Sequence, residues 1–128
     1  MLHLRLPAMK LARAAAMMAG ALALALGASA QGAYPSQAVK LVVPYQAGGA
    51  TDVFARYIAE RLAPVLGQPV LVDNRPGAGT MLASAFVAKA PADGHTLLLT
   101  NAALIQSPLL TGKASYDPIR DFAPVSYL

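Results

Sequence analysis

Residues 39–52 read VKLVVPYQAGGATD, and this stretch decides the fold that the sequence predicts. Its first half, from Val39 to Tyr45, is mostly β-branched and apolar and predicts a buried strand that ends at Pro44. The glycine turn AGGA at 47–50 follows, and Thr51 is expected to cap the start of a helix. A buried strand that runs through a glycine turn into a helix is the unit from which parallel α/β sheets are built.

The helix after this turn is predicted by the spacing of its apolar residues. Asp52 in its first turn complements the positive end of the helix dipole. Gly67 suits the left-handed residue that follows a helix, and Pro69 prevents the helix from continuing. One apolar stripe is expected to face the core, and it comprises Phe54, Ile58, Leu62 and Val65, together with Val53, Tyr57 and Leu66.

The same strand, loop and helix pattern recurs along the chain. Residues 69–73 (PVLVD) predict a second buried strand, and the loop at 74–79 (NRPGAG) is again rich in Gly and Pro. A second helix is expected from about Thr80 to Lys89, and a third buried run covers residues 96–100. This order predicts an α/β fold with a mostly parallel sheet and flanking helices. The residues of the second helix expected to face inward are Leu82, Phe86, Met81 and Ala85.

The last part of the chain gives weaker signals. Residues 101–113 fit either a short helix before Pro108 or a loop. Residues 122–128 (FAPVSYL) have the pattern of another strand at its start.

The first thirty residues have the three regions of a secretory signal peptide. Arg5, Lys10 and Arg13 make the start basic, residues 14–26 form an unbroken apolar run, and the small residues ASA precede the expected cleavage after about Ala30. The apolar run is shorter than the roughly 20 residues that a membrane-spanning helix needs. We therefore expect residues 1–30 to be removed on export, with no stable membrane insertion afterwards.

Composition narrows the classes of function. The formal net charge is +4, but the excess lies in the leader, so residues 31–128 are nearly neutral and offer no basic surface for nucleic acid. The chain contains no Cys, which excludes disulfides and thiol catalysis. His95 is the one histidine after the leader, and neither a zinc-binding HxxxH nor a GxSxG nucleophile pattern occurs. We therefore expect no catalytic residue, metal ion or cofactor.

The chemistry of the chain is expected at the two glycine-rich loops. Each loop joins the carboxyl end of a strand to the start of a helix, where ligands bind in open α/β sheets. The N–H groups of a first helical turn lack intrahelical partners and carry partial positive charge, so they can hold an anion without a cationic side chain. Gly48, Gly49, Gly77 and Gly79 allow the backbone to approach that anion. The alternative is that such turns contain glycine for backbone geometry alone.

Other kinds of site are disfavoured by detail. Residues 77–82 (GAGTML) begin like the dinucleotide motif GxGxxG, but Leu82 stands at the third glycine, and the Gly112-Lys113 pair lacks the rest of a phosphate loop. Asp52 is expected to be a helix-capping or ligand-orienting carboxylate rather than a general base. Arg75 is expected to be solvated or paired at the surface.

The chain resembles a known family, the Bug-type periplasmic solute receptors of tripartite tricarboxylate transporters. The resemblance is carried by VKLVVPYQAGGATDVFAR, VLVDNRPGAGT, VAKAPADGHTLLLT and YDPIRDFAPVS, which follow one another through residues 34–128. It implies a lobe of the type II periplasmic-binding-protein fold and a small carboxylate ligand, either a di- or tricarboxylate or an amino acid. It also implies membrane transporter subunits as partners, and a ligand carboxylate held largely by main-chain groups and bridging waters at the two loops.

Carried onto this sequence, the resemblance implies binding residues at three places. Two departures from the family pattern, Gln46-Ala47 before the double glycine and Ser107-Pro108 after the third strand, mean that ligand preference does not carry over. The implied binding residues are Tyr45, Gln46, Gly48, Gly49, Ala50, Thr51 and Asp52 in the first loop, Gly77, Ala78, Gly79 and Thr80 in the second, and Thr100 and Asn101 after the third strand.

Members of this family have two lobes that close around the ligand, and the sequence ends within the first. We therefore expect residues 31–128 to be the N-terminal part of an α/β solute-binding domain, with the second lobe outside it. The expected function is that of a periplasmic solute receptor that is not an enzyme. The alternative is an exported one-lobe interaction module with no small-molecule ligand. An exported hydrolase is disfavoured, because no histidine-based catalytic constellation is present in the sequence.

Overall fold

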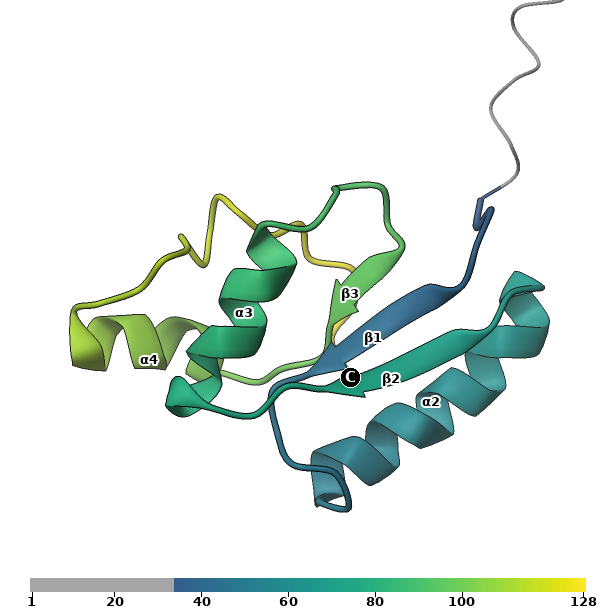
Figure 1. Cartoon of the computed structure of the whole chain (residues 1–128), viewed down its shortest axis with the longest axis horizontal. Helices are drawn as coiled ribbons and strands as arrows, with labels where there is room; N and C mark the ends of the chain where they lie inside the picture. The colour runs from purple at the N-terminus through teal and green to yellow at the C-terminus, as the bar shows by residue number, and fades with distance from the viewer. Residues whose placement is uncertain (1–33) are drawn as a thin grey trace, which may run out of the picture. The chain divides into compact units, whose positions relative to one another are not determined.

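A three-stranded parallel sheet with helices packed on it forms the framework of the protein (Figure 1). The computed structural model describes residues 34–128, so the expected signal peptide lies outside the described residues. The strands are β1 (Val39–Val43), β2 (Val70–Asn74) and β3 (Thr96–Leu98). The helices are α2 (Ala50–Leu66), α3 (Met81–Ala88) and α4 (Ala103–Thr111), and a 3-10 turn, η2 (Ala78–Thr80), precedes α3.

The sheet topology confirms the predicted parallel α/β fold. The strand order is β2-β1-β3, and β1 pairs in parallel with both neighbours. Val43 at the end of β1 lies opposite Asn74 at the end of β2, and Val42 lies opposite Leu98 at the end of β3. The carboxyl ends of all three strands therefore meet at one edge of the sheet, from which the two glycine-rich loops emerge.

Each face of the sheet is covered by a different helix. Leu41 and Val43 pack with Ala55 of α2 on one face. Side chains alternate along a strand, so Lys40 points to the opposite face, where its Nζ atom lies 5.8 Å from the centre of the Phe86 ring of α3. The arrangement is that of a sheet with a helix layer on each side.

The predicted inward faces of the helices are wrong in large part. In α2, Ala55 and Ala59 are buried together with Asp52, whereas Val53, Phe54, Tyr57, Leu62 and Val65 of the predicted stripe are exposed. In α3 the fully buried residues are Ala83 and Ser84. Of the predicted inward residues, Leu82 is exposed, whereas Met81, Ala85 and Phe86 are half-buried. The physical reason is close approach: small side chains let the helix backbone lie near the sheet. The spacing of the largest apolar residues therefore marks the outer face of α2.

The predicted ends of α2 are partly correct. Gly67, in the left-handed conformation at φ +66°, ends the helix as expected. The predicted cap at Thr51 is wrong, because Gly49 occupies the cap position and no side-chain oxygen accepts a bond there. Thr51 instead lies inside the first turn.

The ambiguous segment after β3 is a helix that continues through Pro108. Proline has no N–H, so the carbonyl of Leu104, four residues earlier, loses its helical donor. The buried Tyr116 hydroxyl donates to that carbonyl at 3.0 Å and replaces the missing bond. Sequence spacing does not reveal this compensation, because Tyr116 lies outside the helix.

The predicted strand at 122–128 is not observed, and these residues have no regular structure. Phe122 instead places its ring edge-on against Tyr116, with ring centres 5.8 Å apart. A strand needs a neighbour to which it can hydrogen-bond, and no described strand pairs with this segment. No helix within residues 34–128 has the length and apolar character needed to cross a membrane.

Candidate functional site

The candidate site is the sheet edge at which β1, β2 and β3 end. The first loop, residues 44–49, joins β1 to α2, and the second loop, residues 75–80, joins β2 to α3. Thr100 and Asn101 follow β3 and precede α4. The three groups of residues implied by the family resemblance therefore follow three adjacent strands.

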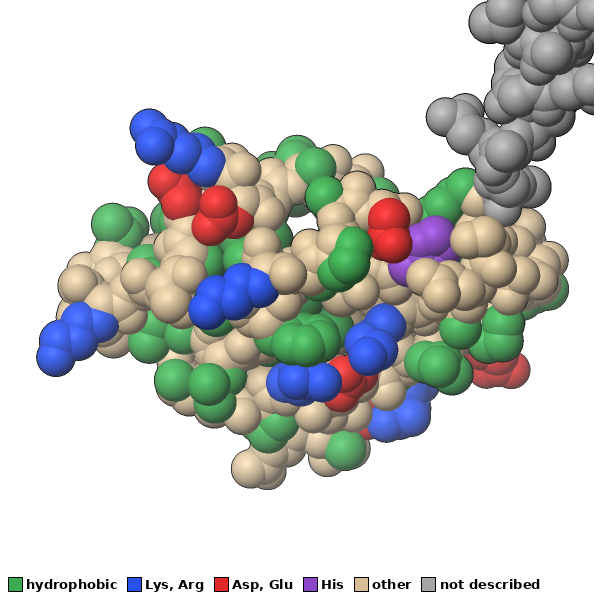
Figure 2. Space-filling view, turned by 45° about the horizontal axis from the view of Figure 1, so that its top comes forward, with side chains coloured by type: hydrophobic (Ala, Val, Ile, Leu, Met, Phe, Trp, Pro, Cys, Tyr) green, Lys and Arg blue, Asp and Glu red, His purple; other side chains and the backbone are tan. Residues whose placement is uncertain are grey.

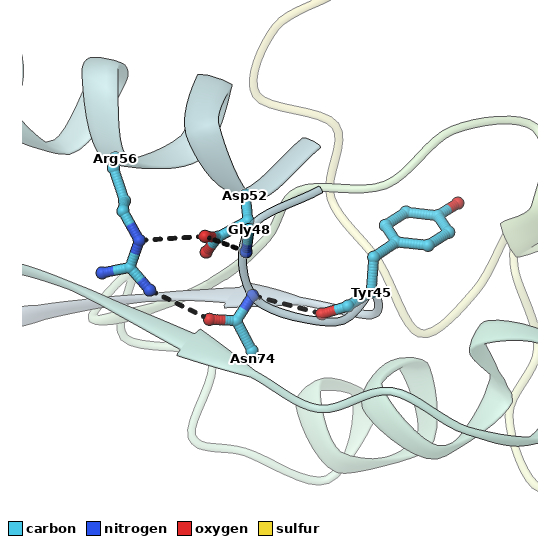
Figure 3. A network of polar contacts seen from close by, with 5 residues as sticks. All are labelled: Tyr45, Gly48, Asp52, Arg56 and Asn74. Atoms are coloured by element: carbon cyan, nitrogen blue, oxygen red, sulfur yellow. Dashed lines mark hydrogen bonds and ion pairs between the residues drawn. The ribbon is translucent and has the colours of Figure 1, made fainter. Parts of the chain in front are cut away.

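The first loop is held by a network of polar side chains (Figure 3). The Oδ2 atom of Asp52 accepts the Gly48 N–H at 2.8 Å and the Nε–H of Arg56 at 3.0 Å. A second guanidinium nitrogen of Arg56 donates to the Oδ1 atom of Asn74 at 3.2 Å. The Asn74 amide nitrogen in turn donates to the Tyr45 carbonyl at 3.1 Å. The network thus links the loop to both α2 and the end of β2.

Asp52 is ionised in this network. Its side chain is buried, and the Arg56 hydrogen bond, followed by the Gly48 N–H, lowers its pKa to about 2. The position agrees with the prediction of a carboxylate in the first helical turn. Its Oδ2 atom accepts from Gly48 and pairs with Arg56, whereas its Oδ1 atom is buried without a hydrogen-bond partner among the described residues.

The backbone of the first loop leaves donors at the start of α2. Gly48 has φ +84°, and residues 46–50 are exposed. The Val53 N–H bonds the Gly49 carbonyl at 3.0 Å, so helical pairing begins at that residue. By helix geometry, the N–H groups of Ala50, Thr51 and Asp52 have no intrahelical acceptor. They form the anion-attracting end of this helix.

The second loop is held by its backbone conformation. Gly77, Ala78, Gly79 and Thr80 are four successive residues with positive φ, at +136°, +48°, +60° and +79°. Positive φ is costly for Ala78 and still more so for the β-branched Thr80. Backbone strain of this kind is concentrated at binding and catalytic sites.

Packing from two helices keeps the second loop in this conformation. The Ser84 hydroxyl of α3 donates to the Thr80 carbonyl at 3.0 Å. The Ser107 hydroxyl of α4 donates to the Gly79 carbonyl at 2.5 Å. Ser107 thus joins α4, which follows β3, to the second loop.

Three hydroxyl groups among the predicted site residues are buried without a hydrogen-bond partner in the described part of the chain. They belong to Tyr45, Thr80 and Thr100, one after each strand. Thr80 as a whole is only 5% exposed. Figure 3 shows the Tyr45 ring pointing away from the Asp52 network, so its hydroxyl takes no part in that network. A buried hydroxyl without a partner costs about 1–3 kcal/mol, which makes these groups candidates for ligand contact.

Other predicted site residues have more local roles. The Oδ1 atom of Asn101 accepts the Ala103 N–H at 2.9 Å at the start of α4. Gln46 is exposed, and its carbonyl lies 3.5 Å from the Gly49 nitrogen across the turn.

Arg75, at the start of the second loop, and His95, outside both loops, make contacts away from the implied binding residues. The Arg75 Nε donates to Asp73 at 2.9 Å, and its guanidinium lies 3.7 Å from the centre of the Phe86 ring. His95 precedes β3, at the opposite end of that strand from the loops. Its Nε2 atom accepts the Ser36 N–H at 3.2 Å.

Two residues of the site were missed by sequence reasoning, namely Arg56 and Asn74. A signal for Arg56 was present, because it stands four residues after Asp52 and so shares its helix face. Asn74 gave a weaker signal, as the amide that directly follows the predicted strand at 69–73.

Outside the two loops, the described residues form grooves but no cluster of metal-binding side chains. No group of three His, Cys, Asp or Glu side chains within residues 34–128 is placed to hold a metal ion. A groove of about 400 Å³ between α3 and residues 113–115 includes Ala78 but is mainly apolar. On the face shown in Figure 2, basic side chains are scattered among apolar ones rather than gathered in one patch.

Comparison with known proteins gives a consistent picture. A family model described as "Tripartite tricarboxylate transporter family receptor" matches residues 54–128. A UPF0065 protein of Bordetella bronchiseptica is 45% identical over 106 residues, which are 82% of this chain and 32% of that protein. The chain therefore spans about a third of the length of this relative.

Solved structures agree in fold and in sequence. The periplasmic binding protein BugD is 42% identical with a TM-score of 0.68, and the match covers 71% of this chain and 30% of BugD. MatC from Rhodopseudomonas palustris, solved with bound malate, is 42% identical with a TM-score of 0.64 over 72% of this chain and 32% of MatC. Another R. palustris protein, solved with adipate, is 44% identical with a TM-score of 0.54 over 56% of this chain and 24% of its own.

Proposed function

This chain belongs to the tripartite tricarboxylate transporter receptor family, and we propose that it binds a small carboxylate at the edge of the sheet where the two loops emerge. In this proposal the protein is an exported, periplasmic receptor that passes its ligand to membrane transporter subunits and catalyses no reaction. A single observation carries the proposal: buried hydroxyls without partners follow all three strands at the edge where α2 begins.

The proposed binding chemistry uses uncharged donors. The first-turn N–H groups of α2 and the hydroxyls of Tyr45, Thr80 and Thr100 are all able to donate to carboxylate oxygens. The nearby arginines are engaged with Asp52 and Asp73. A carboxylate bound here is therefore held by oriented dipoles, with little rearrangement of charged side chains.

The solved relatives support the ligand class. One was solved with malate and another with adipate, which are both dicarboxylates of small size. We propose that this chain takes a ligand of the same class, at the residues that the family resemblance implies in both loops and after β3.

The experiment is a calorimetric titration of the protein, at the full length that its gene encodes, with a panel of mono-, di- and tricarboxylates that includes malate and adipate. Dimethyl malate, which lacks both charges, is the control. We expect saturable binding of at least one dicarboxylate and none of the ester. If no mono-, di- or tricarboxylate binds saturably, the proposal fails and an exported interaction module without a ligand becomes the better account.

A pair of variants locates the site in the same titration. Thr80→Val keeps the branched shape but removes the hydroxyl, and Thr80→Ser keeps the hydroxyl. We expect Thr80→Val to weaken binding about tenfold, as for loss of one hydrogen bond to a charged group, and Thr80→Ser to retain most of it. Equal affinities for the two variants would remove Thr80 from the site.

Export is part of the proposal and has a separate test. The intact mass of the protein recovered from its own cells shows whether the chain begins near Gln31. A protein that still carries residues 1–30 would contradict the proposed signal peptide.

A further inference from the structure

The ionised Asp52 carboxylate creates a difficulty for an anion site at the start of α2. It lies in the first turn of the helix and is 3% exposed, so water screens its charge only weakly. A ligand carboxylate at the same helix end therefore meets a like charge, which disfavours binding. A positively charged group of the protein therefore has to offset the charge of Asp52 if the first loop is to hold an anion.

We propose that Arg56 and Asn74 are positioning residues that make the first loop receptive to a carboxylate, Arg56 by offsetting the charge of Asp52 and Asn74 by fixing both Arg56 and the Tyr45 carbonyl. This inference rests on the proposed function and assigns roles to two residues outside the predicted binding set.

The geometry for charge compensation is direct. The Arg56 Nε lies 3.0 Å from the Asp52 Oδ2, which is a charge-assisted hydrogen bond one helical turn away. The Arg56 side chain is itself half exposed, at 56%. Because the Asp52 carboxylate is buried, Arg56→Gln also lowers folding stability, so urea denaturation of each variant is measured beside its malate affinity to separate the two effects.

Asn74 fits its role through both ends of its amide. Its Oδ1 accepts from Arg56 at 3.2 Å, and its Nδ2 donates to the Tyr45 carbonyl at 3.1 Å. One side chain on β2 thus fixes the direction of the guanidinium on α2 and the path of the chain that leaves β1 (Figure 3). An aspartate at this position would lose the donor to Tyr45 and add a second negative charge.

The test measures malate and adipate affinity of the full-length protein and its variants. We expect Arg56→Gln to weaken dicarboxylate binding about tenfold or more, because Asp52 becomes uncompensated. Arg56→Lys, which restores the positive charge, recovers most of the affinity. Arg61→Gln is the matched control, since it removes the same charge from the same helix. The Arg61 guanidinium stacks on Tyr57, 5.2 Å from the ring centre, and takes no part in the Asp52 network. Arg61→Gln leaves the affinity unchanged.

The double variant Asp52→Asn with Arg56→Gln separates charge compensation from a purely structural role. The two charges disappear together, so we expect the double variant to bind malate more tightly than Arg56→Gln alone. If the double variant binds as weakly as Arg56→Gln alone, or if Arg56→Gln binds normally, the inference is overturned while the proposed function stands. If the unaltered protein binds no carboxylate, both fail together.

Discussion

The two loops that border the candidate site reach a fixed conformation by different means. The first loop is held from outside by the side chains of Asp52, Arg56 and Asn74, which come from two other elements. The second loop has four successive residues of positive φ, and hydroxyls of α3 and α4, from Ser84 and Ser107, bond its Thr80 and Gly79 carbonyls. The first loop should therefore respond to changes of charge and hydrogen bonding, and the second to changes of backbone freedom.

The two loops also differ in the groups that they offer to a ligand. The first loop contributes a helix end whose local carboxylate is compensated by Arg56. The second contributes a buried hydroxyl at Thr80 and contains no titratable side chain at 77–80. A carboxylate bound between them would be sensitive to the charge balance at one loop and to shape at the other.

The largest effect should come from adding one carbon to the second loop. In Gly77→Ala, the backbone at φ +136° disfavours any side chain, and the new Cβ would lie 2.5 Å from the Leu82 Cδ1 atom. The exposed Leu82 side chain can move aside, so the cost comes mainly from the backbone, and we expect the free energy of unfolding to fall by about 2 kcal/mol in urea denaturation.

The first loop supplies the matched control for that change. Gly49 has φ −77°, and a Cβ there meets nothing closer than the Gln46 carbonyl at 3.5 Å. Gly49→Ala should change the free energy of unfolding by no more than about 0.5 kcal/mol. Equal losses of unfolding free energy in Gly77→Ala and Gly49→Ala would contradict the difference proposed between the two loops.

A smaller effect is expected from a side-chain change at the first loop. Asn74→Ala removes two hydrogen bonds of a partly buried amide and leaves the Tyr45 carbonyl without its donor. We expect the free energy of unfolding to fall by about 1 kcal/mol in the same urea assay. Gln106→Ala, at an exposed position of α4, is the control and should be close to neutral. A neutral Asn74→Ala would show that the polar network does not hold the first loop.

The smallest effect is expected on thermal stability when the pH is lowered. Asp52 has its pKa lowered from 3.8 to about 2, chiefly by the Arg56 hydrogen bond. A lowered pKa means that the stabilisation is complete above about pH 4 and is lost as the pH falls through 2. The thermal midpoint of the unaltered protein should therefore fall between pH 5 and pH 2 more steeply than that of Asp52→Asn. Parallel pH profiles would contradict the ionised state of Asp52.

The backbone layout of the site was predictable because short-range signals determine it. Local backbone preferences determine the strand at 39–43, the glycine turn before Asp52 and the end of the helix at Gly67. The structure confirms all three predictions. The parallel sheet followed from the order of these elements.

The side-chain layout was less predictable, because it depends on contacts between distant segments. The inward face of α2 is chosen by how closely Ala55 approaches the sheet, and the predicted stripe of larger residues was wrong for that reason. Helix α4 passes through Pro108 because Tyr116 donates to Leu104. The role of Asn74 depends on Tyr45 and Arg56, which lie 29 and 18 residues away.

The central claim is that both loops together hold a carboxylate through uncharged donors. The most direct test follows the backbone amide NMR signals of Gly48, Gly49, Gly79 and Thr80 while malate is added to the full-length protein, with dimethyl malate as the control. The account predicts that signals from both loops shift saturably with one common dissociation constant and that the ester leaves them in place. Saturable malate binding that leaves the signals of either loop unchanged would contradict it.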